Sequence, residues 1–253
     1  MNYLEAYSNY KVPPNCWIIL RLDGRAFHGV TEYCEKPYDI HLRDAMVSTA
    51  QELLREFDGL YAYVQSDEIS VLLHRSWNLF DRRLEKIVSV FSGLASSKFS
   101  FHWLQQRDSL GLEGVDYPHF DARVCLAVLD EEVANYFKWR MDDAWRNCVQ
   151  AWAYWTLRNN GYSKGKATSK LLSMTVKQEN DMLFSEFGIN VSELPEWQRK
   201  GNGLIWECYE KDGYNPKTEQ TVVCQRRRIV EMLLMPYAYN FIYQIMKSCG
   251  KNK

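Results

Sequence analysis

The order and spacing of apolar residues predict an α+β fold, namely a ferredoxin-like βαββαβ unit followed by a helical and β-hairpin extension. Strand-forming residues fill 16–22, 60–65, 69–73 and 122–128. Segments with helical spacing separate the first strand from the second and the third from the fourth. This order of elements is that of a split βαβ unit, whose strands pair in one antiparallel sheet.

Each of the two helical segments carries an apolar stripe. The first stripe is Leu42, Met46, Ala50, Leu53, Leu54 and Phe57, and the second is Phe80, Leu84, Ile87, Val88, Phe91, Leu94 and Ala95. In both segments the apolar residues have the spacing of one face of a helix. We therefore expect residues 1–129 to form a catalytic unit and residues 130–253 to pack on it as the extension.

Acidic residues stand at the ends of the strands. Asp23 and Gly24 close the first strand, and Asp67 and Glu68 follow the second in a tight turn with Ser66. The first and third strands of this topology are antiparallel neighbours, so Asp23 and Asp67 are predicted to converge. Two carboxylates at one place favour a bound cation, and oxygen ligands with an open side suit Mg²⁺ that carries phosphates. Solvated turn residues are the alternative interpretation.

This arrangement is typical of polymerase palms and nucleotide cyclases. We predict that Asp23, Asp67 and the Gly24 carbonyl hold two Mg²⁺ ions, with Glu68 as a third, supporting carboxylate. Backbone amides and side chains near the metals are expected to bind the nucleotide, and a second triphosphate group is expected near the start of the second helix. The predicted nucleotide-binding residues are Asp23, Gly24, Arg25, Ala26, Phe27, His28, Lys36, Ser66, Asp67, Arg82, Arg83 and Lys86.

The second half of the chain opens with a long helical pattern from Asp130 to Asn159. A basic segment with Lys164, Lys166 and Lys170 then precedes a short helical stretch, and it either binds phosphate or is a solvated face. Residues 203–209 and 221–225 predict a β-hairpin, which Arg226, Arg227 and Arg228 follow directly.

Composition excludes several classes of protein. The chain of 253 residues is 46% hydrophobic with a formal net charge of −1, so any nucleic-acid binding must come from local patches. Seven scattered cysteines without a C-x-x-C pair predict reduced thiols in a cytoplasmic protein, and they argue against a structural zinc site. No Walker-type loop is present, and neither a signal peptide nor a membrane span is predicted.

Several motifs resemble those of the tRNA-His guanylyltransferase family in order and spacing. They are Arg21 to His28, Lys36-Pro37, Gln65 to Glu68, Phe80 to Lys86, Phe120 to Arg123, Tyr136 to Arg140, Asn147, and Leu183 to Asn190. The resemblance implies an RNA nucleotidyltransferase that uses GTP, ATP and other nucleoside triphosphates. It also implies a homodimer or homotetramer that contacts tRNA through Lys164, Lys166, Lys170 and Asn147.

One motif departs from the family. Eukaryotic members carry a His-Ile-Asn-Asn sequence where this chain has Trp145-Arg146-Asn147-Cys148. The resemblance is therefore to the guanylyltransferase-like branch, which implies template-dependent 3′-to-5′ addition that repairs the 5′ end of tRNA. Three alternatives stay open: a tRNA-His guanylyltransferase that adds a single G, a nucleotide cyclase with the same palm-like site, and an RNA-binding module without catalytic activity.

Overall fold

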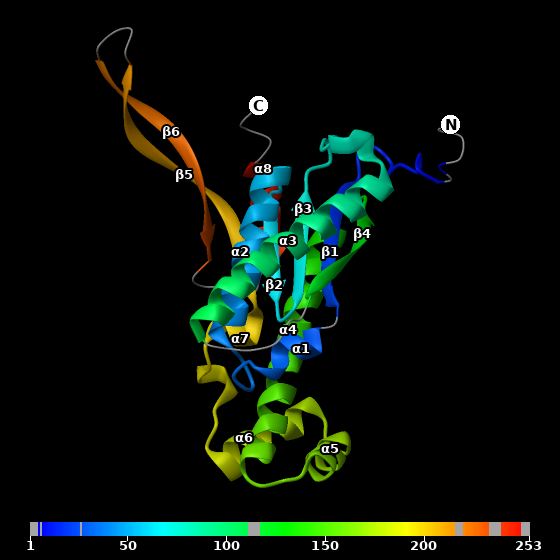
Figure 1. Cartoon of the computed structure of the whole chain (residues 1–253), viewed down its shortest axis with the longest axis vertical. Helices are drawn as coiled ribbons and strands as arrows, with labels where there is room; N and C mark the ends of the chain where they lie inside the picture. Colours follow the sequence, from blue (N-terminus) through cyan, green and yellow to red (C-terminus); the bar gives the residue numbers. More distant parts are fainter. Residues whose placement is uncertain are drawn as a thin grey trace.

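The computed structural model describes residues 5, 7–25, 27–110, 117–215, 220–232 and 239–248. Within these residues one antiparallel sheet has the strand order β4-β1-β3-β2-β5-β6 (Figure 1). Its strands are β1 (Trp17–Arg25), β2 (Tyr61–Gln65), β3 (Glu68–Leu73), β4 (His119–Ala127), β5 (Asn202–Asn215) and β6 (Gln220–Glu231). The predicted βαββαβ order is confirmed, and β1 lies antiparallel to β3 as expected.

Helices cover both faces of this sheet. They are α1 (Phe27–Glu32), α2 (Ile40–Phe57), α3 (Leu84–Leu110), α4 (Asp130–Asn159), α5 (Lys164–Leu172), α6 (Val176–Phe187), α7 (Glu196–Lys200) and α8 (Tyr239–Ser248), with 3₁₀ turns at Leu79–Arg82 and Val191–Glu193. Phe80 belongs to the first of these turns, with a φ of 58°, rather than to the helix that the sequence predicted for it. The helix begins four residues later.

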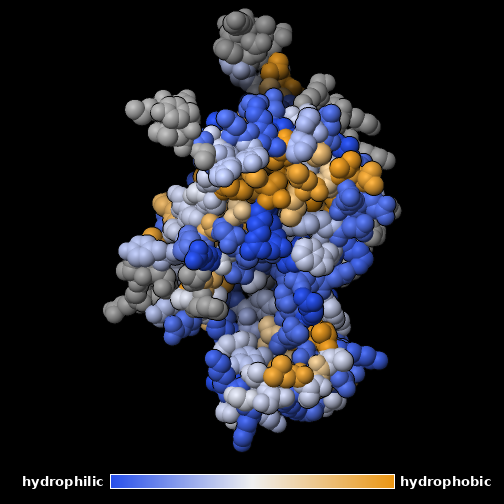
Figure 2. All heavy atoms as spheres, turned by 90° about the vertical axis from the view of Figure 1, so that its right-hand side faces the viewer, coloured by the Kyte–Doolittle hydropathy of each residue, from blue (hydrophilic) through white to orange (hydrophobic). Residues whose placement is uncertain are grey.

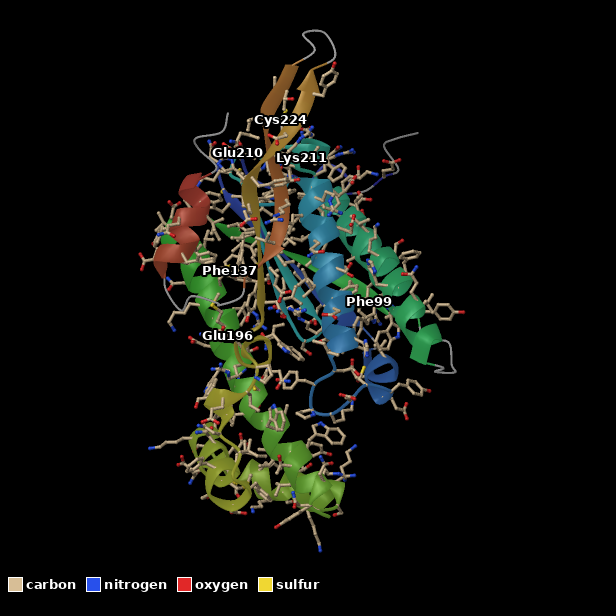
Figure 3. All side chains as sticks on the ribbon, turned by 90° about the vertical axis from the view of Figure 1, so that its left-hand side faces the viewer. Phe99, Phe137, Glu196, Glu210, Lys211 and Cys224 are labelled. Carbon is tan, nitrogen blue, oxygen red and sulfur yellow. The ribbon has the colours of Figure 1, made fainter. Side chains whose placement is uncertain are left out.

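Alternation along the strands sorts side chains between two cores. In β1, Ile18, Leu20 and Leu22 are buried under α2 and α3, while Trp17 and Ile19 are buried on the face of α4 and α8. Figure 3 shows the two cores on opposite sides of the sheet, marked by Phe99 and Phe137. Both faces of the central strands are therefore apolar, and this fixes their register.

The long helix α4 joins the sheet to a small helical region. Its first half packs on the sheet, and its second half forms a third apolar cluster with α5 and α6 that includes Cys148, Val149, Ala153 and Leu183. Figure 1 shows this region at one end of the molecule and the β5–β6 ribbon at the other. The second strand of the predicted hairpin, residues 221–225, was too short. Strand β6 runs from Gln220 to Glu231 and includes Arg226, Arg227 and Arg228.

Strand β5 pairs with β2, so residues from both halves of the chain share one sheet. None of the described helices is long and apolar enough to cross a membrane.

Candidate active site

The end of β1 and the β2–β3 turn meet at one edge of the sheet. Asp23 lies opposite Glu68 in the β1–β3 register, and the Gly24 amide donates a hydrogen bond of 2.9 Å to the Asp67 carbonyl. The turn consists of Ser66 and Asp67, and Ser66 adopts a positive φ of 51°. The backbones of Asp23 and Asp67 therefore lie side by side, as the topology predicted.

Glycine is required at position 24 by close packing. A Cβ atom there would lie 2.6 Å from the ring of Phe27, which is buried against Phe99 and Phe120. The Phe27 side chain is therefore part of the core, and only its backbone is available for the predicted nucleotide contact. Ala26 and the side chain of His28 lie outside the described residues.

Glu68 points to the α4 face of the sheet and forms ion pairs there. Its carboxylate lies 2.8 Å from Arg140 Nε and 3.6 Å from Arg21 Nε, and Ser70 Oγ donates to it at 3.5 Å. Burial raises the pKa of Glu68, while the two arginines oppose that rise. The predicted supporting role is compatible with this placement, because the carboxylate is held by arginines beside the turn.

Strand β4 adds two charged residues that the site prediction missed. Asp121 lies opposite Asp23 in the β1–β4 register, and Arg123 Nη2 lies 3.7 Å from Asp23 Oδ2 and Nε lies 3.6 Å from Asp121 Oδ1. All three side chains are partly exposed. Asp121 directly precedes the predicted strand 122–128, and Arg123 lies in it. Their spacing of two residues was the available signal, because it places both side chains on one face of a strand.

The donors at this edge fit Mg²⁺. In the described part of the chain, no three His, Cys, Asp or Glu side chains form a ready-made metal cluster. Mg²⁺ is usually bound by one or two carboxylates together with water and substrate phosphates, which matches Asp23 and Asp67. Arg123 beside Asp23 offers a positive charge for the same phosphates.

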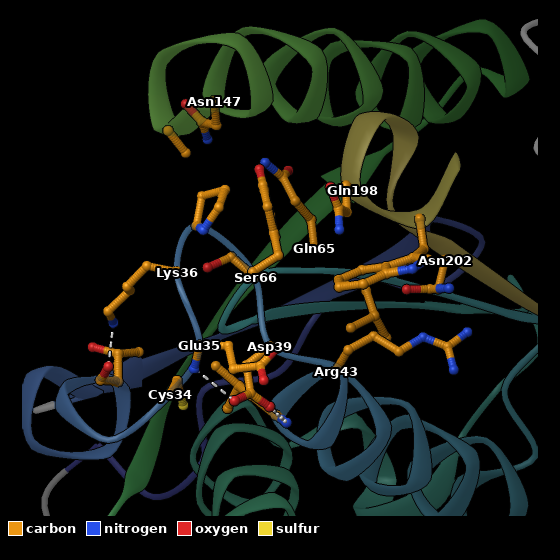
Figure 4. Close-up of a pocket in the computed structure, with 17 residues that line it drawn as sticks. Cys34, Glu35, Lys36, Asp39, Arg43, Gln65, Ser66, Asn147, Gln198 and Asn202 are labelled. Carbon is orange, nitrogen blue, oxygen red and sulfur yellow. Dashed lines mark hydrogen bonds between the residues drawn. The ribbon is translucent and has the colours of Figure 1, made fainter. Parts of the chain in front are cut away.

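A pocket of about 310 Å³ opens beside the turn (Figure 4). It lies between the α1–α2 segment, the β2–β3 turn, α4 and α7. Its lining residues are Thr31, Cys34, Glu35, Lys36, Pro37, Tyr38, Asp39, Leu42, Arg43, Val64, Gln65, Ser66, Asn147, Ala151, Trp197, Gln198 and Asn202. A volume of this size with aromatic and amide walls is typical of a small-molecule site. Of these residues, the sequence predicted only Lys36, Ser66 and Asn147 as site residues.

Hydrogen bonds fix one wall of the pocket. Asp39 caps α2 by accepting from the amides of His41 and Leu42 at 2.7 and 3.0 Å, and it also accepts from the Glu35 amide at 2.8 Å. Lys36 donates to the Thr31 carbonyl, with its ammonium 5.6 Å from the centre of a Trp155 ring. The wall is therefore preorganised by the chain itself.

Cys34 also lines this pocket and is buried. Burial raises its pKa to about 12, and the charge of Asp39 adds to the rise. The thiol therefore stays protonated at neutral pH and is a poor nucleophile.

Three predicted nucleotide ligands lie at the other end of the sheet. The five N–H groups of Arg82 donate to the carbonyls of Val12, Pro13, Cys16, Arg75 and Trp77. Cys16 precedes β1, whereas Asp23 is near its end, and seven residues of extended chain span about 23 Å. The guanidinium of Arg82 therefore holds loops together, and its part in the predicted second triphosphate group stays a prediction. Arg83 and Lys86 adjoin it at the start of α3, so a second triphosphate group there would be separate from the Asp23 edge.

The predicted tRNA-binding residues lie in two different places, the lysines on α5 and Asn147 in the pocket. Lys164, Lys166 and Lys170 lie within α5 itself, with Ser163 as its N-cap, whereas the sequence predicted a basic segment ahead of a helix. Lys166 and Lys170 share a face of α5, and Lys170 pairs with Glu186 at 3.0 Å. Asn147 is instead part of the pocket, on α4.

Comparisons with known proteins identify the family of this chain. Residues 1–128 match the family model for tRNA-His guanylyltransferase, and residues 131–233 match that for the C-terminal domain of the same enzymes. The chain is 35% identical over 222 residues to the tRNA-His guanylyltransferase of Debaryomyces hansenii, covering 85% of this chain and 84% of the relative. It is 33% identical over 203 residues to the probable enzyme of Mus musculus, covering 78% and 67%.

Solved structures give the same result. A bacterial tRNA-His guanylyltransferase-like protein in complex with ATP superposes with a TM-score of 0.76 at 27% identity, covering 97% of this chain and 96% of that one. The Saccharomyces cerevisiae enzyme has a TM-score of 0.73 at 26% identity, covering 80% and 90%. A bacterial guanylyltransferase-like protein in complex with GTP has a TM-score of 0.69 at 29% identity, covering 96% of each chain. The chain therefore belongs to the tRNA-His guanylyltransferase family of nucleotidyltransferases.

Proposed function

We propose that this protein adds nucleotides to the 5′ end of tRNA in the 3′-to-5′ direction and that an opposing template base selects each nucleotide. The observation that carries this proposal is the position of the pocket. Ser66 lines it and Asp67 follows directly, so a nucleoside triphosphate with its base in the pocket has its phosphates at Asp23 and Asp67. The bacterial guanylyltransferase-like structures in complex with ATP and with GTP support nucleotide binding by this chain.

Each residue has a separate task in the proposed reaction. Asp23, Asp67 and the Gly24 carbonyl would hold two Mg²⁺ ions, which polarise phosphoryl oxygens and lower the pKa of an attacking hydroxyl when bound. Arg123, and Arg25 at the exposed end of β1, offer positive charge to the phosphates. The 3′-hydroxyl of the incoming nucleotide attacks the 5′-phosphorus of an activated tRNA. Pyrophosphate leaves from a 5′-triphosphate, or AMP from an adenylylated end.

Selection by a template is supported by Trp145. This residue stands where eukaryotic relatives have the histidine of their His-Ile-Asn-Asn motif, and its ring packs on the apolar cluster of α4, α5 and α6. An indole in such a place donates a single N–H and accepts nothing, so it cannot replace a histidine in reading guanine. Base pairing then remains as the means of choosing the nucleotide.

The remaining parts of the proposal concern partners and location. We include tRNA contact by the lysines of α5, a homodimer or homotetramer, and a cytoplasmic location. Figure 2 shows apolar residues gathered over the upper part of one face, and Leu126, Val128 and Leu129 at the end of β4 are exposed. A second copy of the chain would bury such a surface. The buried thiols of Cys34 and Cys148 suit a reducing compartment.

The test is nucleotide addition to a tRNA that lacks its first 5′ nucleotide, with Mg²⁺ and each nucleoside triphosphate offered separately. Templates that differ only in the opposing base are compared. We expect the complementary nucleotide in each case. Addition of G opposite every base would favour the guanylyltransferase that adds a single G, and tRNA binding without addition would favour the inactive RNA-binding module.

The same assay tests the carboxylates. Asp23→Asn and Asp67→Asn each remove one negative charge with little change of shape, and each should lower the rate of addition by about 10³-fold or more, since several kcal/mol of transition-state stabilisation depend on the metals. Unfolding temperatures near that of the wild type would show that the fold is intact. Turnover near the wild-type rate in either variant would contradict the metal assignment.

A further inference from the structure

The β2–β3 turn that carries Asp67 is held from outside by one helix. Three residues on one stripe of α4 reach strands β2 and β3 at or beside the turn. Tyr136 shares a hydrogen bond of 2.8 Å with Ser70, and Arg140 Nε lies 2.8 Å from Glu68 Oε1. The third is Asn147, which contacts Gln65. Residues 136, 140 and 147 are spaced by four and seven, so they follow one face of the helix.

Both residues that flank the turn are therefore anchored. In the amide orientation that its surroundings favour, Gln65 donates to the Arg140 carbonyl at 3.2 Å and accepts from Asn147 Nδ2 at 3.1 Å. Glu68 lies on the other side of the turn and binds the side chain of the same arginine. Arg140 thus contacts the chain immediately before and immediately after Ser66 and Asp67.

The turn requires such support because its backbone is strained. Ser66 has a φ of 51°, a conformation that favours glycine, and a non-glycine residue keeps it only when its surroundings enforce it. The turn also sets the metal site, because the Asp67 carbonyl accepts from the Gly24 amide at 2.9 Å. Movement of the turn would therefore displace Asp67 from Asp23.

Arg140 is itself fixed on several sides. Its side chain is 8% exposed, its Nη2 lies 3.0 Å from Asp143 Oδ2, and its guanidinium carbon lies 4.5 Å from the centre of the Trp139 ring. A planar guanidinium held between a ring and two carboxylates has one orientation, which a lysine ammonium would not keep.

We propose that Arg140 is a positioning residue for catalysis: it anchors Glu68 to α4, so that the strained turn presents Asp67 beside Asp23. Glu68 then acts as the attachment point of the turn rather than as a metal ligand. The inference rests on the proposed metal-binding role of Asp67. In this proposal α4 links two regions: its second half packs against α5 and α6, and Arg140 contacts the turn at the catalytic edge.

The experiment measures nucleotide addition as a function of Mg²⁺ concentration for Arg140→Gln and Arg140→Lys. We expect Arg140→Gln to raise the half-saturating Mg²⁺ concentration and lower kcat, together by about 10- to 100-fold, as for other residues that orient metal ligands. The KM for tRNA should stay within about twofold because no phosphate contact is lost. Arg140→Lys should recover part of the loss, since it keeps the charge.

The matched control is Arg146→Gln. Arg146 lies on the same helix, but its side chain is 58% exposed and its described ion pair and hydrogen bond are with Asp143 rather than with the turn. Its Mg²⁺ dependence should equal that of the wild type. If the role of Arg140 is purely structural, Arg140→Gln will have a lower unfolding temperature, but nucleotide addition by its folded protein will depend on Mg²⁺ as in the wild type. This result would overturn the proposal.

Two further variants keep the outcome decisive. If Arg140→Gln and Glu68→Gln both fold, the double variant should cost no more activity than the worse single variant, and additive losses would refute the linkage. If Arg140→Gln does not fold, Arg140→Lys takes its place and should still raise the half-saturating Mg²⁺ concentration, and a wild-type Mg²⁺ dependence there would refute the linkage. Asp67→Asn separates the two proposals: full activity there contradicts the metal site itself, whereas an inactive Asp67→Asn with wild-type behaviour of Arg140→Gln contradicts only the positioning role.

Discussion

Replacing Gly24 by alanine should damage the active site through one defined collision. The new Cβ would lie 2.6, 2.7 and 2.9 Å from three atoms of the Phe27 ring. Ordinary contact begins near 3.4 Å, so the ring or the end of β1 must move by about 0.8 Å. The ring is 4% exposed, with its centre 4.9 Å from that of Phe99 and 5.3 Å from that of Phe120, so it has little room.

Gly24→Ala should lower both the stability of the protein and its rate of nucleotide addition. Overpacking of a dense core costs about 1–3 kcal/mol, which corresponds to a fall in Tm of about 2–12 °C for a chain of this size. A displacement near 1 Å at the metal donors should slow nucleotide addition by about 10²-fold. Circular dichroism gives the Tm, and single-turnover addition well below the Tm of the variant gives the rate of the folded protein.

A control and a rescue make the test specific. Gly93 lies in α3, and a Cβ there meets no atom within 4 Å, so Gly93→Ala should leave activity unchanged and raise stability by about 0.5–1 kcal/mol. Phe27→Leu should restore part of the activity of Gly24→Ala by making room. The reasoning fails if Gly24→Ala has the wild-type Tm and rate, or if the leucine gives no recovery.

Other regions of the molecule give three more expectations. Arg82→Lys should lower the free energy of unfolding by about 3 kcal/mol or more, because buried carbonyls lose their donors, while the KM for nucleoside triphosphate at the Asp23 site stays unchanged; a raised KM with an unchanged Tm would restore its role as a ligand. Burial lowers the pKa of His102 below 6.5, so the unfolded chain takes up the proton first and stability should fall as pH drops below 6.5. In chemical unfolding from pH 8 to pH 5, His102→Gln should flatten that slope, and an identical slope would contradict the assignment. Replacing Lys164, Lys166 and Lys170 by alanine should weaken tRNA binding and reduce the slope of log affinity against log salt by about 0.7–0.9 per phosphate contact; an unchanged slope would mean that these lysines form a solvated face.

The sequence by itself determined the elements that carry the chemistry. Alternating and helical apolar spacing is a local property, and it predicted the βαββαβ order and the strand–turn–strand around Asp67 correctly. Topology then placed Asp23 beside that turn, because the first and third strands of this unit are neighbours. Residues within a few positions of the strand ends were therefore accessible to prediction.

Only the tertiary structure decided which distant residues share the site. Asp39, Gln65, Trp197 and Asn202 form one pocket although they come from four segments, and nothing local in the sequence marks them as neighbours. Arg82 looked like a phosphate ligand because a charged residue near a helix start is ambiguous until its partners are known. Its five carbonyl acceptors come from two loops that meet only in the folded chain. The strand pattern predicts position along the sheet, whereas long-range packing decides which charges are buried, paired or free to meet a substrate.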